Sequence, residues 1–300
     1  MVYGLQHCYQ PLMLAISFGL FAALCWSVHD LVARRFAEVI GPYRMALATL
    51  LVGALLLSGW VAWRGTLGHA DAALLWRVVI LGLAYGAAVS SLFKAFSMAP
   101  VSVVGPFTAG YPALVVLWGV YTGSYPGFLQ YVAILVILLG AVVVGRFGPA
   151  DGGLGSVAKN RIVPLFFFCT VAVVCFAAAV ILGQAVSLKL GEIETTFLSR
   201  LPAAMLLLPL AMTEKTAASR FSRASWTGIF AMALLDVSAV AAINYMGRLP
   251  GKELGAMGIS AYGAVSVLLA MIILKEKVAA GQWAGIAMIV AGVGTLSVPA

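Results

Sequence analysis

Apolar runs long enough to cross a membrane alternate with short polar loops along the whole chain. A helix needs about 17–25 apolar residues to span a bilayer, and these runs are continuous, unlike the alternating strands of a β-barrel. The pattern predicts an all-α polytopic membrane protein with ten transmembrane helices. Their expected ranges are 12–32, 43–63, 74–98, 101–121, 126–145, 163–187, 195–212, 226–246, 254–274 and 279–299.

The second half of the sequence repeats the first half. The matched residues lie 150–156 positions apart and are Arg44 and Arg200, Trp76 and Trp226, Pro100 and Pro250, Gln130 and Gln282, and Gly140 and Gly292. Each copy holds five predicted spans, so an odd number of crossings separates equivalent residues and the copies are inverted. We expect a first repeat over residues 1–148, a linker over 149–162 and a second repeat over 163–300. Arg44 and Arg200 are then expected at opposite membrane faces.

Composition narrows the function classes. The chain is 63% hydrophobic and 9% charged, whereas a soluble domain has roughly 25% charged residues. The net charge of +8 comes from basic residues scattered over loops and helix ends, where they set topology and contact anionic headgroups, so nucleic-acid binding is not predicted. No P-loop or HExxH motif occurs, and the four cysteines lack metal-ligand spacing. We predict no enzyme activity, catalytic residue, cofactor or metal site.

The end of each repeat carries a recurring pattern, in Ala99–Val143 and again in Leu249–Val293. The second copy has Glu276 after a helix and then the stretch QWAGIAMIVAGV, which begins at Gln282. The first copy departs from it, with Ser124 at the acidic position. The pattern resembles the EamA branch of the drug/metabolite transporter superfamily.

The resemblance extends to the start of each repeat. Arg44 and Arg200 are similar to the arginines that open helices two and seven in the family, and Trp26–Ser27 resembles a Trp-Ser pair in helix one of its bacterial amino-acid exporters. The resemblance implies the EamA fold and a multi-pass protein of the cell inner membrane. Its implied partners are the lipid bilayer and a small-molecule substrate, an amino acid or similar metabolite. Whether the protein is a monomer or a dimer is left open.

The orientation in the membrane has two conflicting indications. Family members are placed with both termini in the cytoplasm. In this chain most of the 18 Lys and Arg residues fall in the odd-numbered loops, and the positive-inside rule would place those loops in the cytoplasm instead. We follow the family placement.

Two aspartates are the predicted proton-coupling residues. A charge at mid-membrane costs about 2.5–3.5 kcal/mol, so an ionisable residue there is a functional candidate. Asp236 lies ten residues into the eighth span, where it would carry a coupling proton, pair with a substrate ammonium, or bond between helices for packing. Asp30 follows His29 near the end of the first span, and such a pair is able to shuttle protons; alternatively, Asp30 simply pairs with Arg34 one turn later. Because consecutive helical residues point about 100° apart, we expect that His29 and Asp30 do not both face one cavity.

The rest of the predicted site is a polar and aromatic cavity lining. We expect the cavity between the first, third, fourth, sixth, eighth and ninth spans, with the fifth and tenth spans outside it. Tyr111–Pro112 should interrupt the fourth helix, while Lys94 has the alternative of extending to the membrane surface. Aromatic rings among hydroxyl and amide groups suit an amphipathic, partly apolar solute. The predicted lining residues are Trp26, Ser27, His29, Tyr85, Ser91, Lys94, Tyr111, Gln184, Asn244, Tyr245, Ser260 and Tyr262.

Three function classes remain to be compared. The first is a secondary transporter that exports amino acids or similar metabolites by alternating access. The second is a proton-coupled multidrug antiporter; related small antiporters use a glutamate in their first helix, which this chain lacks, although Asp236 could replace it. The third is a membrane enzyme or scaffold, but the histidines do not cluster in the sequence, and a scaffold does not need duplicated halves. The sequence therefore favours a transporter.

Overall fold

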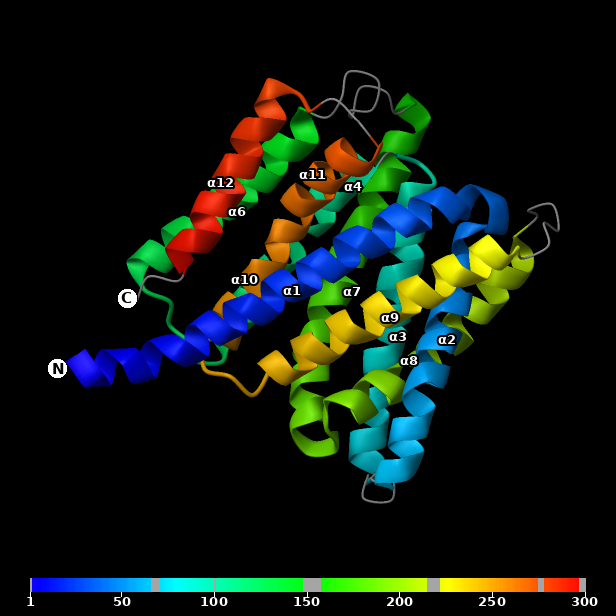
Figure 1. Ribbon diagram of the computed structural model, residues 1–300, viewed down its shortest axis with the longest axis horizontal. Coiled ribbons are helices and arrows are strands. Elements are labelled where there is room, and N and C mark those ends of the chain that lie inside the picture. The colour runs from blue at the N-terminus through cyan, green and yellow to red at the C-terminus, as the bar shows by residue number, and fades with distance from the viewer. Residues whose placement is uncertain are drawn as a thin grey trace.

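The computed structural model is a bundle of α-helices that cross one another at varied angles (Figure 1). The structure describes residues 2–65, 71–99, 101–147, 158–214, 222–274 and 278–296, and no strand occurs within these ranges. The helices are α1 (Val2–Ile40), α2 (Pro42–Arg64), α3 (Ala72–Phe96), α4 (Val101–Thr108), α5 (Tyr111–Tyr121), α6 (Phe128–Arg146), α7 (Lys159–Leu190), α8 (Glu192–Thr213), α9 (Arg223–Met246), α10 (Lys252–Gly258), the 3-10 helix η3 (Ile259–Ala261), α11 (Tyr262–Leu274) and α12 (Ala280–Leu296).

The predicted all-α membrane fold is confirmed. Nine stretches of the described chain are long and apolar enough to span a bilayer, and α12, with 17 residues, is the shorter tenth. α4 with α5 forms one crossing, and α10 with η3 and α11 forms another. Large apolar side chains such as Leu55, Val142 and Met205 are 72%, 67% and 74% exposed. In a membrane protein such side chains face lipid, so the outer surface suits a bilayer.

The described part of the predicted linker 149–162 is mostly helical, because α7 begins at Lys159. Residues 148–157, and Glu276 of the family pattern, lie outside the described residues.

Two crossings are interrupted in mid-membrane. α5 begins at Tyr111 with Pro112 in its first turn, and the predicted break falls there because proline provides no N–H for the helix ladder. The ninth crossing, which was expected to be continuous, changes to a 3-10 turn over Ile259–Ala261. Just before this turn, a Cβ on Gly258 would lie 2.9 Å from the carbonyl oxygen of Ile16. This close contact with α1 is a tertiary feature that hydrophobicity does not reveal.

Two pairs of equivalent helices, α2 with α8 and α6 with α12, pack against each other, whereas α1 packs against α9 and α3 packs against α7. At one end of α2, the backbone N–H of Arg44 donates to Glu214 Oε2 just beyond α8, at 3.0 Å. At the other end, Arg64 Nε lies 3.9 Å from Glu194 Oε1 near the start of α8. α6 and α12 also lie side by side, at the edge of the molecule (Figure 1). Because α2 begins where α8 ends, the two repeats are inverted relative to each other, as predicted.

The offset between the repeats in this region is 150 rather than 156. Gly41 precedes α2 with φ 95°, and Gly191 precedes α8 with φ 97°, a left-handed conformation that glycine adopts without strain. When the repeats are aligned on these glycines, Arg44 matches Glu194. The predicted equivalence of Arg44 and Arg200 is therefore wrong. Arg200 lies about two turns into α8 and is fully buried, not at a membrane face.

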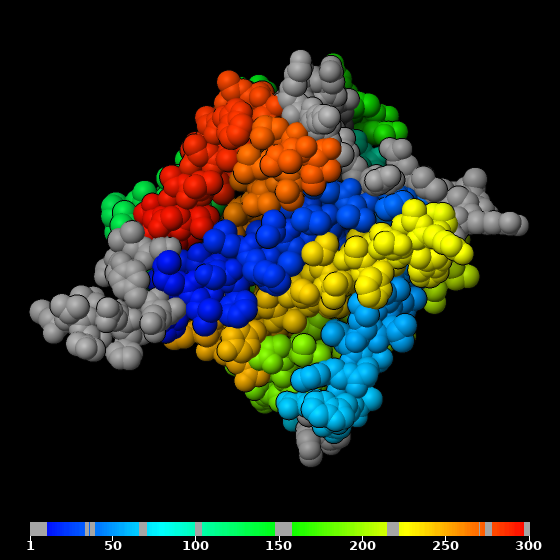
Figure 2. All heavy atoms as spheres, in the orientation of Figure 1, coloured from blue at the N-terminus to red at the C-terminus, as the bar shows by residue number. Residues whose placement is uncertain are grey.

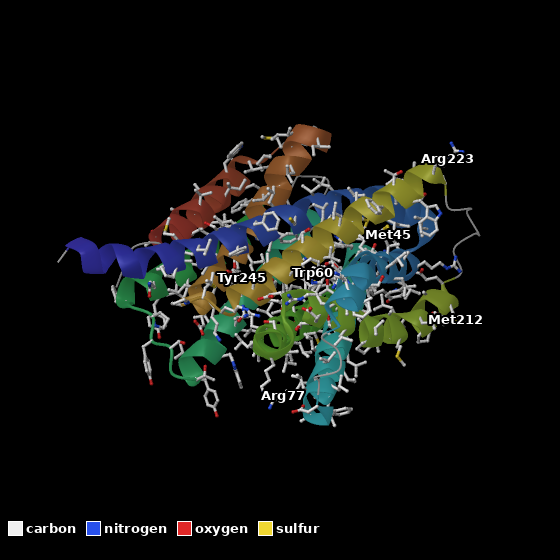
Figure 3. All side chains as sticks on the ribbon, turned by 60° about the horizontal axis from the view of Figure 1, so that its bottom comes forward. Met45, Trp60, Arg77, Met212, Arg223 and Tyr245 are labelled. Carbon is white, nitrogen blue, oxygen red and sulfur yellow. The ribbon has the colours of Figure 1, made fainter. Side chains whose placement is uncertain are left out.

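The two ends of α2 define the two membrane faces, which we call the Arg44 face and the Arg64 face. α1 crosses towards the Arg44 face, and α3 starts from the Arg64 face. Figure 2 shows α1 and α9 side by side across one surface, with α11 and α12 on one flank and α2 on the other. In Figure 3, Arg77 near the start of α3 and Arg223 at the start of α9 lie at opposite ends of the molecule. α9 thus starts from the Arg44 face.

Candidate functional site

A buried cavity, here called the central cavity, lies between the two repeats. Its volume is about 60 Å³, which is room for a few water molecules. All the expected crossings contribute to it, α2 contributes as well, and α6 and α12 do not. Its polar and aromatic lining residues are Trp26, His29, Asp30, Thr49, Tyr85, Phe93, Thr108, Tyr111, Phe176, Asp236 and Tyr262, and its aliphatic ones are Ala46, Leu50, Val89, Leu92, Ala109 and Ile259.

Asp236 is held by three donors on the wall of the central cavity. Arg200 Nη2 forms an ion pair with Asp236 Oδ2 at 2.5 Å. Tyr85 Oη and Trp26 Nε1 donate to Oδ1 at 2.6 and 3.2 Å. Arg200 also donates from Nη1 to the carbonyl oxygen of Thr196 at 2.8 Å. The protein itself thus neutralises the Asp236 carboxylate and ties α1, α3, α8 and α9 together through it.

Asp30 has a different kind of partner. Its Oδ1 lies 2.8 Å from His29 Nδ1, and its Oδ2 accepts a hydrogen bond from the Tyr262 hydroxyl. All three side chains are buried and line the central cavity. The expectation that His29 and Asp30 face different ways is wrong, because their side chains bend towards each other. No three His, Cys, Asp or Glu side chains of the described chain are grouped to hold a metal ion.

Two buried hydroxyls in the central cavity have no hydrogen-bond partner among the described residues. They are Thr49 Oγ1 on α2 and Tyr111 Oη at the start of α5. An unsatisfied buried polar group costs about 1–3 kcal/mol, so groups of this kind normally bond to water or to a ligand. The cavity therefore combines a carboxylate, a histidine and two open hydroxyls with an aromatic wall.

A second, smaller cavity lies beyond an aromatic layer formed by Trp26, Tyr85 and Phe176. These three residues line both cavities. The Phe176 ring centroid is 6.3 Å from the ring of Trp26 and also 6.3 Å from that of Tyr85. The second cavity has a volume of about 30 Å³, and its other lining residues are Leu81, Ala179, Val180, Ser199, Val240, Ile243 and Asn244.

The structure brings together about half of the predicted site residues. Trp26, His29, Asp30, Tyr85, Tyr111, Asp236 and Tyr262 line the central cavity, and Asn244 lines the second cavity. The remaining six, which line neither cavity, are Ser27, Ser91, Lys94, Gln184, Tyr245 and Ser260.

Three of these six residues have other roles in the fold. Ser27 Oγ donates to the carbonyl oxygen of Tyr262 at 3.2 Å and so ties α1 to α11. Gln184 Nε2 donates to the carbonyl oxygen of Ile243 at 3.4 Å. Tyr245, labelled in Figure 3, is 41% exposed and its ring packs 5.1 Å from that of Phe18. These side chains hold helices together or face outward, so they are not available to a solute in either cavity.

Among the residues that the sequence does not indicate at the site are Arg200, Thr49, Phe93 and Phe176. Arg200 has the same signal that singled out Asp236, a charge inside an apolar span, but its assignment to a helix start concealed it. Phe176 lies 150 positions after Trp26, so the repeat offset would have identified it. Thr49 and Phe93 have no distinguishing signal in the sequence.

Known proteins share this architecture. A solved crystal structure of a protein matches 94% of this chain and 95% of its own, with a TM-score of 0.75 and 19% sequence identity, and so has the same fold. No curated protein matches the chain. The sequence profile of the EamA-like transporter family matches residues 13–146 and again residues 164–298. The chain therefore belongs to the EamA-like transporter family, with one copy of the family unit in each half.

Proposed function

We propose that this protein is a secondary transporter of the inner membrane that exports an amino acid or a similar metabolite through the central cavity. The observation that carries the proposal is Asp30. It is a buried carboxylate in the cavity whose ion-pair partner in the described chain is His29, and histidine is cationic only when protonated. A solute that brings an ammonium group would supply a positive charge that does not depend on protonation of His29.

Asp30 and Asp236 suit different tasks. Asp236 already has a permanent cation in Arg200, which is 0% exposed and cannot leave without a large desolvation penalty. Asp30 is bonded to a titratable ring and a neutral hydroxyl. The carboxylate that is able to exchange a proton for a substrate ammonium is therefore Asp30, and Asp236 positions the wall of the cavity. This reverses the order of the two sequence-based candidates.

The rest of the central cavity suits the other parts of an amphipathic solute. The faces of aromatic rings attract cations and pack well against apolar groups, and Trp26, Tyr111 and Phe176 form such a wall. The open hydroxyls of Thr49 and Tyr111 are able to donate to a carboxylate. An amino acid with an apolar or aromatic side chain would use all three kinds of group.

The position of the central cavity between the two repeats agrees with alternating access, because movement of one repeat against the other would open it to either side. The small residues and broken helices around α1 and α10 provide close but non-bonded contacts that are able to slide.

A proton-coupled multidrug antiporter remains the second candidate, and one observation favours it. Asp30 places a carboxylate in the first helix beside aromatic rings, which is the arrangement that an organic cation without a carboxylate would use. The two candidates differ in whether the hydroxyls of Thr49 and Tyr111 matter for transport.

Flux into proteoliposomes distinguishes these candidates. The solutes are L-phenylalanine, its decarboxylated analogue phenethylamine, and tetraphenylphosphonium, each with and without a pH gradient. An exporter of amino acids moves L-phenylalanine, and Thr49→Val impairs it. A multidrug antiporter moves the two cations and tolerates Thr49→Val.

Asp30→Asn tests the carboxylate itself. Losing a hydrogen bond to a charged group costs about 1.5–3 kcal/mol, so we expect at least tenfold weaker uptake of any transported ammonium compound and loss of the pH-gradient dependence. Asp71→Asn is the matched control, because Asp71 caps α3 outside the cavity and asparagine caps a helix equally well. Wild-type flux with unchanged pH dependence in Asp30→Asn would contradict the proposal.

A further inference from the structure

The second cavity is the counterpart of the central cavity in the other repeat. With the offset of 150 fixed by Gly41 and Gly191, residues of one cavity map onto residues of the other. The matched pairs are Trp26 and Phe176, Asp30 and Val180, and Thr49 and Ser199, of which the first member lines the central cavity and the second lines the smaller one.

The two cavities lie at different depths in the membrane. Thr49 is in the first third of α2, and Phe93 is near the end of α3, so both lie towards the Arg44 face. Ser199 is in the first third of α8, and Asn244 is at the end of α9, so both lie towards the Arg64 face. The aromatic layer separates the two cavities at mid-membrane.

The aromatic layer is fixed in place by the cavity wall. Trp26 Nε1 and Tyr85 Oη both donate to Asp236, and Asp236 is locked to Arg200. Trp26 and Phe176 are themselves equivalent residues of the two repeats. In transporters with inverted repeats, the two repeats alternate between two conformations. A barrier to which both repeats contribute equivalent residues is therefore expected to block the path from one face in one conformation and from the opposite face in the other.

The two cavities differ in charge. The His29–Asp30 pair of the central cavity is replaced by Ala179 and Val180 at the equivalent positions. Besides Trp26 and Tyr85 of the aromatic layer, the polar side chains of the smaller cavity are Ser199 and Asn244. Ser199 Oγ donates to the carbonyl oxygen of Thr196 at 3.1 Å, and Asn244 Nδ2 donates to Thr196 Oγ1 at 3.0 Å, so the side-chain oxygens of Ser199 and Asn244 are the groups able to accept from a solute. The smaller cavity is therefore able to hydrogen-bond a solute but not to neutralise its ammonium group.

We propose that the smaller cavity is a second solute site on the same path, entered from the Arg64 face and separated from the central cavity by the Trp26–Tyr85–Phe176 layer as a gate. Its ligand is the same amphipathic solute, held by hydroxyl and amide groups after its ammonium has left Asp30. The solute identity rests on the proposed function. The existence of two cavities and a gate does not.

Cysteine labelling tests the path without any knowledge of the solute. Thr49→Cys and Ser199→Cys are made separately after Cys8, Cys25, Cys169 and Cys175 are replaced by alanine, and oriented membranes are treated with a membrane-impermeant trimethylammonium methanethiosulfonate. We expect Thr49→Cys to react at least tenfold faster from the Arg44 face, and Ser199→Cys at least tenfold faster from the Arg64 face. Thr195→Cys is the matched control: Thr195 is 0% exposed and lines neither cavity, so it should not react.

The gate is tested in the same assay with Trp26→Ala. Opening the aromatic layer should allow Ser199→Cys to react from both faces. Equally fast reaction of Ser199→Cys from both faces with Trp26 intact would overturn the gate, and no reaction from either face would overturn the second site. If labelling is as expected but neither L-phenylalanine nor phenethylamine is transported, the proposed substrate fails while the path stands.

A charge transplant tests whether the second cavity binds the solute. Asp30→Val should weaken equilibrium binding of radiolabelled phenethylamine at least tenfold, because a hydrogen bond to a charged group contributes about 1.5–3 kcal/mol, and Asp30→Val with Val180→Asp should recover that binding. Failure of the monodisperse double variant to recover binding would contradict a solute site in the smaller cavity.

Discussion

The contribution of the Arg200–Asp236 ion pair to stability can be measured by removing first one partner and then both. Asp236→Leu leaves the guanidinium of Arg200 buried, with the Thr196 carbonyl as its described acceptor and Nε without a partner among the described residues. Breaking a buried ion pair from one side costs about 3–5 kcal/mol. The Tyr85 hydroxyl also loses its acceptor, which costs about 1–3 kcal/mol more.

The double variant Arg200→Met with Asp236→Leu should be the more stable of the two. It removes both charges, and replacing a buried pair by apolar residues of similar volume is often neutral, so the loss of the Tyr85 bond remains as the main cost. We expect the single variant to be less stable than the double variant by about 3 kcal/mol.

Thermal unfolding in detergent micelles, followed by tryptophan fluorescence, measures the difference, with Arg200→Met completing a double-mutant cycle. Arg64→Met is the control, because Arg64 is 54% exposed and lies 3.9 Å from its partner, and exposed pairs contribute about 0–1 kcal/mol. If Asp236→Leu unfolds at the same temperature as the double variant, the pair does not hold a buried charge and its assigned positioning role is refuted.

Two further predictions concern packing and topology. Gly19→Ala should destabilise the bundle strongly, because the new Cβ would lie 2.2 Å from the carbonyl oxygen of Gly255. The control is Gly59→Ala, which has no atom within 4 Å of the new Cβ and should leave the unfolding temperature unchanged or raise it. Equal unfolding temperatures of the two variants would show that α1 and α10 are not in contact. Cysteines at Arg64 and Thr213, at the ends of the equivalent helices α2 and α8, should react with an impermeant reagent from opposite faces, and reaction of both from one face would contradict the inverted repeat.

The sequence predicts the helices well because their apolar length is a local property. The interrupted ninth crossing is different, since its 3-10 turn follows a close contact between Gly258 and Ile16, which are distant in the chain. The sequence also identifies Asp30 and Asp236 as site residues, because a charged side chain within an apolar span is energetically costly and therefore rare.

What the sequence could not provide is which groups meet. The donors to Asp236 come from α1, α3 and α8, and nothing local places them at one depth. The matching of Arg44 to Arg200 failed for a related reason. It aligned the repeats on two residues of the same type, whereas the shared positive φ of Gly41 and Gly191, visible only in the structure, aligns them correctly. Six predicted lining residues lie elsewhere because polarity alone does not indicate which side of a helix faces a cavity.

The network around Asp236 also constrains how the protein is assembled in the membrane. Trp26, Tyr85 and Arg200 are synthesised before the carboxylate that binds them, so α8 enters the bilayer with an arginine whose counter-charge is on the next helix. A lone charge at the bilayer centre costs about 2.5–3.5 kcal/mol on insertion scales. We therefore expect α8 and α9 to enter as a hairpin, with Asp236 joining helices that are already in place.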